Sequence, residues 1–329
     1  MRFARPLPLL GAIVGLGLVL WLIAHVGVQT ILAAIGRIHW WQFVLICLAY
    51  PLVLIADSIG WHFSFPRASA PFTQLLLARA AGEAVNAASA IAPVAGEPLR
   101  AWMVRPWVPY EESVPSIVVA KTTNTMAQVL LLGLALLVAM ATLRLERAIL
   151  LGMAGLLAFE VLAISAFVVT QVWGGMSGLG WLLRRFGMSR GAKSATRMDQ
   201  MLARYYTHHR GRLVASLLFH FAGRMLGAVE VLVIMWSLRM PVTPIVALTV
   251  EAIGAGVRFA TFFLPGSLGA LEAANAAAFE ALGMGAGAGL AFILLRRGRQ
   301  VVWIALGLAA IGLARLRAPR GAAWSPPVV

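Results

Sequence analysis

"RAAGEAVNAASAIAPVAGEPLRAWMVR", running from Arg79 to Arg105, is the stretch that decides the fold. Most of it is apolar, yet it carries arginines, two glutamates, an asparagine and two prolines. Proline and glycine interrupt a helix and free backbone groups that lipid cannot satisfy, so such a break must face protein or a water-filled cavity. The stretch therefore predicts a broken helix or a re-entrant hairpin inside a membrane protein.

The composition of the whole chain agrees with that prediction. Of its 329 residues 61% are hydrophobic and 12% are charged, whereas soluble domains carry about 25% charged residues. The chain is thus expected to be an all-α polytopic membrane protein. We expect the net charge of +15 to attract anionic lipid headgroups at the cytoplasmic face rather than nucleic acid.

Six apolar runs are long enough to cross a bilayer as helices, which takes about 20 residues each. They are Leu7 to Ala24, Trp41 to Phe63, Val114 to Leu143, Ala148 to Val172, Leu213 to Leu238 and Leu290 to Ala314. Two further stretches, Thr73 to Val104 and Val242 to Leu282, are interrupted near their middles. The prediction is six full spans plus two broken segments, forming one membrane domain over residues 1–315 with a short cytoplasmic tail over 316–329.

The orientation follows from the basic residues. The connection from Gly174 to Arg212 holds eight basic residues and one acid, and both ends of the chain are basic. By the positive-inside rule these parts are cytoplasmic, which places a multi-pass protein in the cell membrane with both termini inside. The two broken segments then enter from opposite sides, as in an inverted pseudo-repeat.

The second broken segment has residue types in a similar order to those of the first. It reads "EAIGAGVRFATFFLPGSLGALEAANAAAFEALG" from Glu251 to Gly283, with an opening Glu-Ala, a Pro-Gly break and a later glycine. The expected breaks lie at Pro93 and Gly96 in the first segment and at Pro265, Gly266 and Gly269 in the second. We expect these two turns to meet near the middle of the membrane.

Charged and amide side chains share helix faces in both segments. Arg79, Glu83 and Asn86 fall on one face, and Glu97 and Arg100 are three residues apart. The helix start beside Glu97 is expected to offer free N–H groups to an anion. Glu251 shares a face with Arg258. All of these side chains are candidate substrate-binding residues. Lys121 adds a further charge to them, and the remaining candidates are Glu272, Asn275 and Arg296.

A charge at the middle of a bilayer costs at least about 2.5 to 3.5 kcal/mol on insertion scales, so these residues cannot all face lipid. Two interpretations stay open: pairing that only fixes helix packing, or a cavity that binds a substrate. We favour the second for at least part of the set, because small residues and hydroxyls pack helices at lower cost. Glu160, Arg224 and Glu230 are assigned to helix packing.

The motifs "GEAVN", "AGEPLRA" and "LPGSLGALEAA" resemble the membrane region of lysylphosphatidylglycerol synthases and the related flippase-like membrane proteins, some of which accompany hopanoid biosynthesis. Gly82, Glu83, Asn86, Gly96, Glu97 and Arg100 match the first motif region, and Pro265, Gly266, Gly269 and Glu272 match the second. Relatives commonly have a paired glycine before the second glutamate and a Glu-Arg pair in the following span. This chain has Ala95-Gly96 and Ala120-Lys121 there, so the resemblance leaves the headgroup open. It implies movement of a lipid between leaflets.

The leading hypothesis is a flippase or transporter of a phospholipid, a polyprenyl-linked lipid or a hopanoid-type lipid. Only a few residues follow the last span, where full-length synthases carry an aminoacyl-transferase domain, so aminoacylation by this chain is not expected. No cofactor and no metal site are expected. The alternatives are a membrane-embedded lipid-modifying enzyme with Glu83, Glu97 or Glu272 as acid or base, and an accessory subunit among lipid-biosynthesis enzymes.

Overall fold

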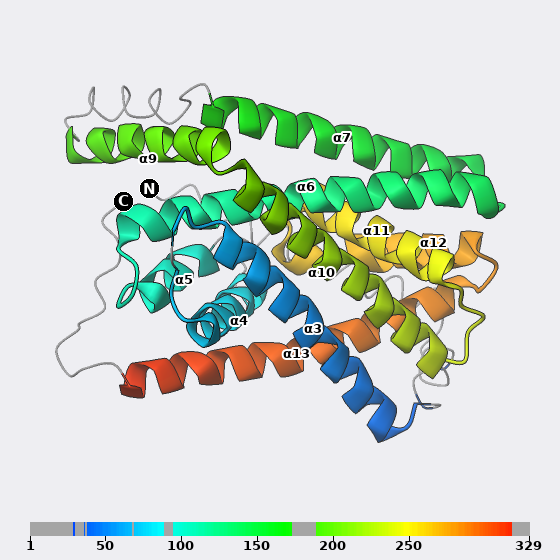
Figure 1. Ribbon diagram of the computed structural model, residues 1–329. Coiled ribbons are helices and arrows are strands. Elements are labelled where there is room, and N and C mark those ends of the chain that lie inside the picture. Colours follow the sequence, from blue (N-terminus) through cyan, green and yellow to red (C-terminus); the bar gives the residue numbers. More distant parts are fainter. Residues whose placement is uncertain are drawn as a thin grey trace, which may run out of the picture.

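The computed structural model describes residues 38–67, 69–88, 95–172 and 189–317, together with the isolated positions 29 and 36. Every regular element in this part of the chain is a helix (Figure 1). The elements are α3 (Trp40–Phe63), α4 (Phe72–Ala88), α5 (Gly96–Val104), α6 (Tyr110–Thr142), α7 (Arg147–Val172), α9 (Ser189–His208), α10 (Arg210–Ser237), α11 (Pro244–Ala260), the short 3₁₀ turn η1 (Pro265–Ser267), α12 (Ala270–Ala281) and α13 (Ala286–Arg317). The predicted all-helical class is confirmed.

Four described helices have the length and hydropathy of membrane spans: α3, α6, α7 and α10. They coincide with four of the six predicted runs to within a few residues. The sixth run is α13, which is long enough but carries three arginines in one turn. The first predicted run, Leu7 to Ala24, lies outside the described residues, as does the tail beyond residue 317.

Local signals place the helix ends. Pro109 precedes α6, and Glu111 and Glu112 stand in its first turn, where negative charge interacts favourably with the helix dipole. At α11 the Thr243 side chain accepts a hydrogen bond from the backbone N–H of Val246, and proline occupies the first turn. Both starts use chemistry that suits backbone N–H groups left without a partner inside the helix.

At the centre of the molecule α3 and α10 pack side by side along their length and run in opposite directions (Figure 1). Glycines let these two helices approach closely. A Cβ on Gly60 would lie 2.8 Å from the His220 ring, and a Cβ on Gly223 would lie 2.9 Å from Asp57 Oδ1. Small residues at such contacts are the usual means of packing membrane helices, and here they bring a carboxylate and an imidazole into the core.

Each predicted broken segment is a helical hairpin. The α4 helix packs along α5, and α11 packs along α12. The nine residues of α5 extend about 14 Å and the twelve of α12 about 18 Å, well short of a hydrocarbon core of about 30 Å. The returning arms therefore cannot be full spans. Pro93 lies outside the described residues, whereas Pro265 begins η1 and Gly266 and Gly269 take positive φ angles of 58° and 78°.

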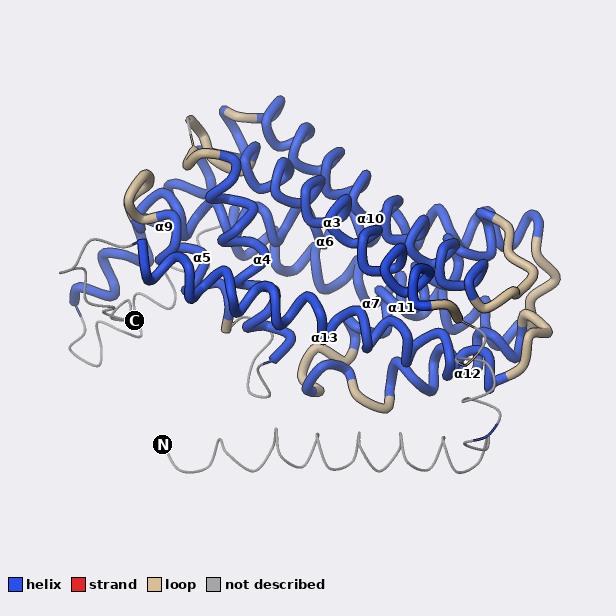
Figure 2. Tube along the Cα trace, turned by 90° about the horizontal axis from the view of Figure 1, so that it is seen from below, coloured by secondary structure: helices blue, strands red, loops and turns tan. Residues whose placement is uncertain are grey.

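The two hairpins sit toward opposite ends of the bundle (Figures 1 and 2). Their surroundings correspond as well, because α13 packs on α4 and α6 packs on α11. The series α3–α4–α5–α6 and α10–α11–α12–α13 thus repeat one arrangement in opposite directions. This agrees with the predicted inverted pseudo-repeat.

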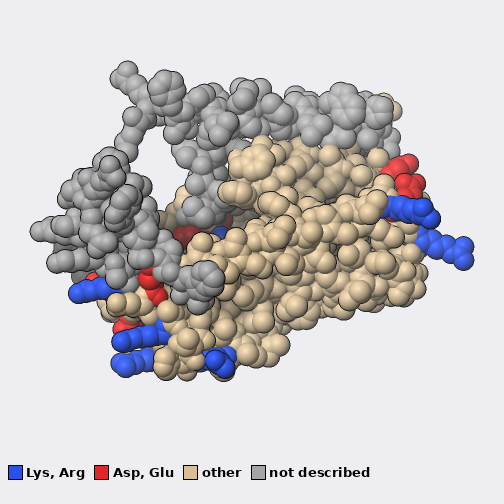
Figure 3. All heavy atoms as spheres, turned by 90° about the horizontal axis from the view of Figure 1, so that it is seen from above, with Lys and Arg blue, Asp and Glu red and all other residues tan. Residues whose placement is uncertain are grey.

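The outer surface is that of a protein in lipid. Large apolar side chains such as Leu137, Leu151 and Leu162 are more than two-thirds exposed on α6 and α7. Figure 3 shows charged side chains gathered near the two ends of one face, with an almost uncharged band between them. An exposed apolar band with charged ends is expected where hydrocarbon takes the place of water.

The basic connection between α7 and α10 contains the helix α9. Its Leu202 and Tyr205 side chains are buried, and α9 packs against α6, α7 and α10. The Tyr205 hydroxyl donates to the Phe63 carbonyl oxygen at 2.7 Å, and the Tyr206 hydroxyl donates to Gln171 Oε1 at 2.5 Å. These bonds fix α9 to the cytoplasmic end predicted for the bundle.

Candidate functional site

A cavity of about 790 Å³ opens between the two hairpins and the long helices. Its wall combines seven cationic side chains with four carboxylates, and these groups come from α3, α4, α5, α6, α10, α11 and α13. A smaller cavity of about 280 Å³ adjoins it and shares Glu83, Lys121, Arg258 and Arg296 with it. Predicted site residues from both broken segments therefore meet at one place.

Most charges around the cavity form ion pairs between or within neighbouring helices. Six pairs can be assigned one to one, with N···O distances from 2.6 to 3.3 Å. They are Arg79–Asp57, Arg100–Glu83, Lys121–Glu97, Arg296–Glu251, Arg299–Glu230 and Arg297–Glu272. Buried charges are stable only when they are paired in this way, so much of the set serves helix packing as well as any ligand.

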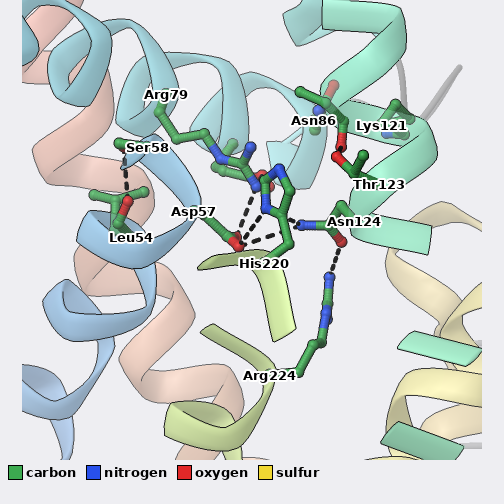
Figure 4. Close-up of polar contacts among 12 residues, drawn as sticks. Leu54, Asp57, Ser58, Arg79, Asn86, Lys121, Thr123, Asn124, His220 and Arg224 are labelled. Atoms are coloured by element: carbon green, nitrogen blue, oxygen red, sulfur yellow. Dashed lines mark hydrogen bonds and ion pairs between the residues drawn. The ribbon is translucent and has the colours of Figure 1, made fainter. Parts of the chain in front are cut away.

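The first group centres on Asp57 of α3 (Figure 4). Arg79 Nη2 donates to Asp57 Oδ2 at 2.7 Å and lies 3.5 Å from Glu83. On its other oxygen, Asp57 accepts from Asn124 at 3.3 Å and lies 3.0 Å from His220 Nδ1. Arg79 and Glu83, which share a helix face, thus make only the longer of the two contacts. The shorter contact is to a carboxylate on a different helix.

The α4–α5 hairpin holds the second group. Arg100 donates to Glu97 at 2.8 Å and to Glu83 at 2.8 Å, so it joins both arms of the hairpin. The backbone N–H of Gly96 donates to Asn86 Oδ1 at 2.7 Å. The expectation that this helix start is free for an anion is therefore wrong for that N–H group. Asn86 occupies it because the hairpin folds α5 back onto α4.

The third group belongs to the other hairpin and α13. Glu251 accepts from Arg296 at 2.6 Å and from Arg258 at 3.5 Å, so the predicted Glu251–Arg258 pair is the weaker contact. Glu230 lies 3.0 Å from Arg299 and 3.5 Å from Arg296. Both carboxylates are almost fully buried. The arginines of α13 thus neutralise acids of α10 and α11.

Two cations on the cavity wall remain after the one-to-one assignment. Arg224 of α10 has no carboxylate within 4 Å in the described part of the chain; its guanidinium donates to the Asn124 side-chain oxygen. Arg258 has only the 3.5 Å contact with Glu251, and 35% of its side chain is exposed. Lys121 is paired at 3.3 Å and 49% of its side chain is exposed. The cavity therefore has an excess of positive charge.

Three predicted binding residues lie beside the cavities rather than on their walls: Glu97, Glu272 and Asn275. Glu272 accepts from the Gly269 N–H at 2.8 Å and from Arg297. Asn275 donates to the Leu271 carbonyl at 2.7 Å. Glu272 thus caps α12 and joins it to α13, and Asn275 bonds within α12. Whether any of the three contacts a substrate stays a prediction.

The cavity wall also includes Asp57, Arg224 and Glu230, which the sequence pattern did not indicate as binding residues. Arg224 and Glu230 were assigned to packing, and Asp57 was not among the predicted site residues. Asp57 is the single Asp, Glu, Lys or Arg of the run Trp41 to Phe63, and Arg224 and Glu230 are the two charges of the run Leu213 to Leu238. The insertion cost of a charge within a span was the signal that could have found them.

The other wall of the cavity is apolar. Phe159, Ile164 and Phe167 of α7 line it, together with Phe262 next to the end of α11. Phe159 and Phe167 are also close to half exposed at the outer surface, and Phe262 is 60% exposed. The site is thus amphipathic, and its apolar wall continues to the surface that faces lipid.

Fold and site together define a class: a multi-pass membrane protein with two opposed hairpins around a charged internal cavity. The family model described as the lysylphosphatidylglycerol synthase TM region matches residues 9–308. The chain therefore belongs to that family, as the resemblance indicated, and is a membrane protein of lipid metabolism or translocation. A comparison with curated proteins finds no match.

Proposed function

We propose that the protein moves a lipid with an anionic headgroup between the two leaflets, and that the central cavity holds the headgroup. The observation that carries this proposal is the excess of positive charge on the cavity wall, with Arg224 and Arg258 left over after six ion pairs. Guanidinium groups bind phosphate through charge-assisted and often bidentate hydrogen bonds. A phosphate is therefore the chemical partner that suits the two leftover arginines.

The apolar wall supplies a place for the rest of the lipid. A headgroup beside Arg258 has the aromatic side chains Phe159 and Phe262 close by on the same cavity. Because these side chains also reach the lipid-facing surface, the hydrocarbon tails can stay in the bilayer while the headgroup is inside. This favours a phospholipid or a polyprenyl-linked or hopanoid-type lipid over a small soluble anion.

The opposed hairpins supply the means of access from both sides. Transporters built from inverted repeats move one repeat against the other around a fixed central site. Here α4–α5 lies toward one end of the bundle and α11–α12 toward the other (Figure 2), and residues of both hairpins line the cavities. Rocking of the two halves about the α3–α10 contact would expose the headgroup site to each leaflet in turn.

For the orientation we propose the cell (inner) membrane, with both termini and α9 on the cytoplasmic side. The basic residues of the α7–α10 connection then lie where anionic lipid headgroups are concentrated, each contributing about 1 kcal/mol of attraction near the surface. A lipid that reaches this face, from the bilayer or from a lipid-biosynthesis enzyme beside it, is drawn toward the cavity.

The proposal is tested with purified protein in vesicles that hold a trace of fluorescently labelled phosphatidylglycerol. Reduction of the label from outside by dithionite measures how fast lipid crosses the bilayer. We expect the protein to accelerate crossing over protein-free vesicles. The double variant Arg224→Gln, Arg258→Gln is expected to remove most of that acceleration.

The matched control is the double variant Arg144→Gln, Arg147→Gln, which removes two exposed arginines where α6 is followed by α7. With this control, lipid is expected to cross the bilayer at the native rate. Protein that gives no acceleration overturns the proposal, as does a double cavity variant that is as fast as the control. Appearance of a chemically new labelled lipid would support the embedded-enzyme alternative instead.

A further inference from the structure

Glu160 lies in the middle of α7 and is fully buried. Its Oε1 accepts a hydrogen bond from Gln128 Nε2 at 2.6 Å, while its Oε2 has no hydrogen-bond partner among the described residues. Four other buried carboxylates, Asp57, Glu230, Glu251 and Glu272, each lie within 3.0 Å of an arginine. No described cation lies within ion-pair distance of Glu160. It is the buried acid that helix packing leaves unpaired.

An unpaired carboxylate inside a membrane protein is costly, and a buried acid of this kind is commonly a group that takes up and gives back a proton. A purely structural role would be served by glutamine or by a hydroxyl at lower cost. Gln128 separates Glu160 from the central cavity, because Gln128 lines that cavity and Glu160 does not. The carboxyl group is thus one side chain away from the headgroup site.

Two amide side chains of α6 lie between this acid and the unpaired arginine, and each bonds to one of them. Gln128 holds Glu160, and Asn124, one helical turn earlier on the same face, accepts from Arg224. The order across the core is Glu160 of α7, Gln128 and Asn124 of α6, then Arg224 of α10 (Figure 4 shows the Asn124–Arg224 part). Glu160 and Arg224 thus each hydrogen-bond to an amide side chain on the same face of α6.

The remaining charged groups around Glu160 are few. From α11, Arg258 faces the cavity with Glu251 as its partner, and from α6, Lys121 faces it with Glu97. The α9 helix meets α7 further along, where Tyr206 contacts Gln171. On α7 itself the only other ionisable side chain is Arg147, exposed at the first residue. Arg224 is thus the cation best placed to respond to a change of charge on Glu160.

We propose that Glu160 is a proton-binding site that couples lipid movement to a proton gradient, with one proton carried alongside each monoanionic headgroup. The inference rests on the proposed lipid translocation. In the empty cavity the charge of Arg224 stabilises ionised Glu160 through the intervening amides. A phosphate bound at Arg224 cancels that charge, and Glu160 then takes a proton from water on the loading side.

No covalent bond of the lipid breaks in this cycle. The proton binds a Glu160 carboxylate oxygen on one side and returns to water on the other side once the phosphate has left. Because a monoanion and a proton cross together, the transported unit is neutral. A difference of about one pH unit should then hold about a tenfold difference in labelled lipid between the leaflets, with more lipid in the leaflet on the alkaline side.

The test uses proteoliposomes with trace labelled phosphatidylglycerol, with and without a difference of about one pH unit across the membrane. The native protein is expected to shift the leaflet ratio about tenfold per pH unit. Glu160→Gln keeps the size and the bond to Gln128 but binds no proton, and it is expected to show no shift. The matched control Glu146→Gln removes an exposed carboxylate just before α7 and is expected to behave as the native protein.

If the Glu160→Gln protein no longer moves lipid, a second measurement tests the proposal. Calorimetry of short-chain phosphatidylglycerol binding in two buffers of different ionisation enthalpy counts the protons taken up, expected to be about one for native protein and about none for the variant. Equal uptake by both proteins, or an unshifted ratio with native protein, overturns the proton proposal. Native protein that equilibrates lipid without responding to pH leaves the proposed translocation standing, whereas native protein that moves no lipid removes both.

Discussion

Arginine-to-alanine changes at Arg100 and Arg258 are expected to damage the protein in opposite ways, because the two side chains have different surroundings. Only 6% of the Arg100 side chain is exposed, and its two terminal nitrogens each lie 2.8 Å from a carboxylate. The Arg258 side chain is 35% exposed and has a single contact at 3.5 Å. The first arginine is a structural partner of the hairpin, and the second is available to a ligand.

The expected loss of folding stability depends on which ion pairs remain after each substitution. Breaking a buried ion pair costs about 3 to 5 kcal/mol. We expect about 3 kcal/mol for Arg100→Ala, the lower end, because Glu83 retains Arg79 at 3.5 Å and Glu97 retains Lys121 at 3.3 Å. Arg258→Ala leaves Glu251 with Arg296 at 2.6 Å and should cost less than about 1 kcal/mol, as exposed pairs do.

For the rate of lipid transport, in contrast, Arg258→Ala is expected to have a large effect. A hydrogen bond to a charged group contributes about 1.5 to 3 kcal/mol, so loss of Arg258 should slow lipid crossing roughly 10- to 150-fold. Arg258→Lys keeps the charge without the bidentate geometry and should recover part of the rate. Crossing rates would be taken from protein that passed through the same purification and melting measurement.

Thermal melting and the rate of labelled-lipid crossing, measured on the same preparations, show whether each arginine serves helix packing or headgroup binding. The expected pattern is early melting for Arg100→Ala and near-native melting with slow crossing for Arg258→Ala. If Arg258→Ala melts as early as Arg100→Ala, Arg258 is a packing residue. Native crossing by Arg258→Ala would remove it from the headgroup site.

Three further changes test the hairpins and α9. Gly96→Ala places a Cβ about 2.0 Å from the Gly82 carbonyl oxygen, which should destabilise the hairpin by more than about 1 to 3 kcal/mol, whereas Gly155→Ala, with no atom within 4 Å of its added Cβ, should melt like native protein. Glu272→Gln removes the negative charge from a buried ion pair, so earlier melting is expected, and unchanged melting with lost transport would instead make it a binding residue. Tyr205→Phe removes the hydroxyl that bonds to the end of α3, costing about 1 kcal/mol, and limited proteolysis should then cut near α9 sooner.

The helices themselves could be predicted because their cause is local. An apolar run of about 20 residues has to form a helix in lipid, where each backbone group needs a partner within the segment. The run predicted from Leu213 to Leu238 is α10, Arg210–Ser237, and the run from Val114 to Leu143 is α6, Tyr110–Thr142. The ends differ by a few residues because capping and the basic or acidic first turns extend a helix beyond its apolar part.

The positions of the two broken segments could be predicted from proline, glycine and charge. Whether each segment is a full span or a hairpin could not. Whether such a segment crosses the membrane or turns back depends on what packs beside it. Gly96 lies against the Gly82 backbone with no room for a Cβ of its own, a Cβ on Gly82 would meet the Arg100 side chain, and α13 packs on α4. Those contacts join parts of the chain that are far apart in sequence.

By itself, then, the sequence determined the helical class, the apolar spans, the two breaks and the charges that lipid cannot surround, because each follows from residues a few positions apart. Only the tertiary structure decided the partners of those charges. Helical spacing suggested Glu83 for Arg79 and Arg258 for Glu251, yet the shorter contacts come from Asp57 on α3 and Arg296 on α13. Spacing along one helix fixes which side chains share a face. The crossing of helices distant in sequence decides which charges meet and which one, at Arg224, is left without a carboxylate.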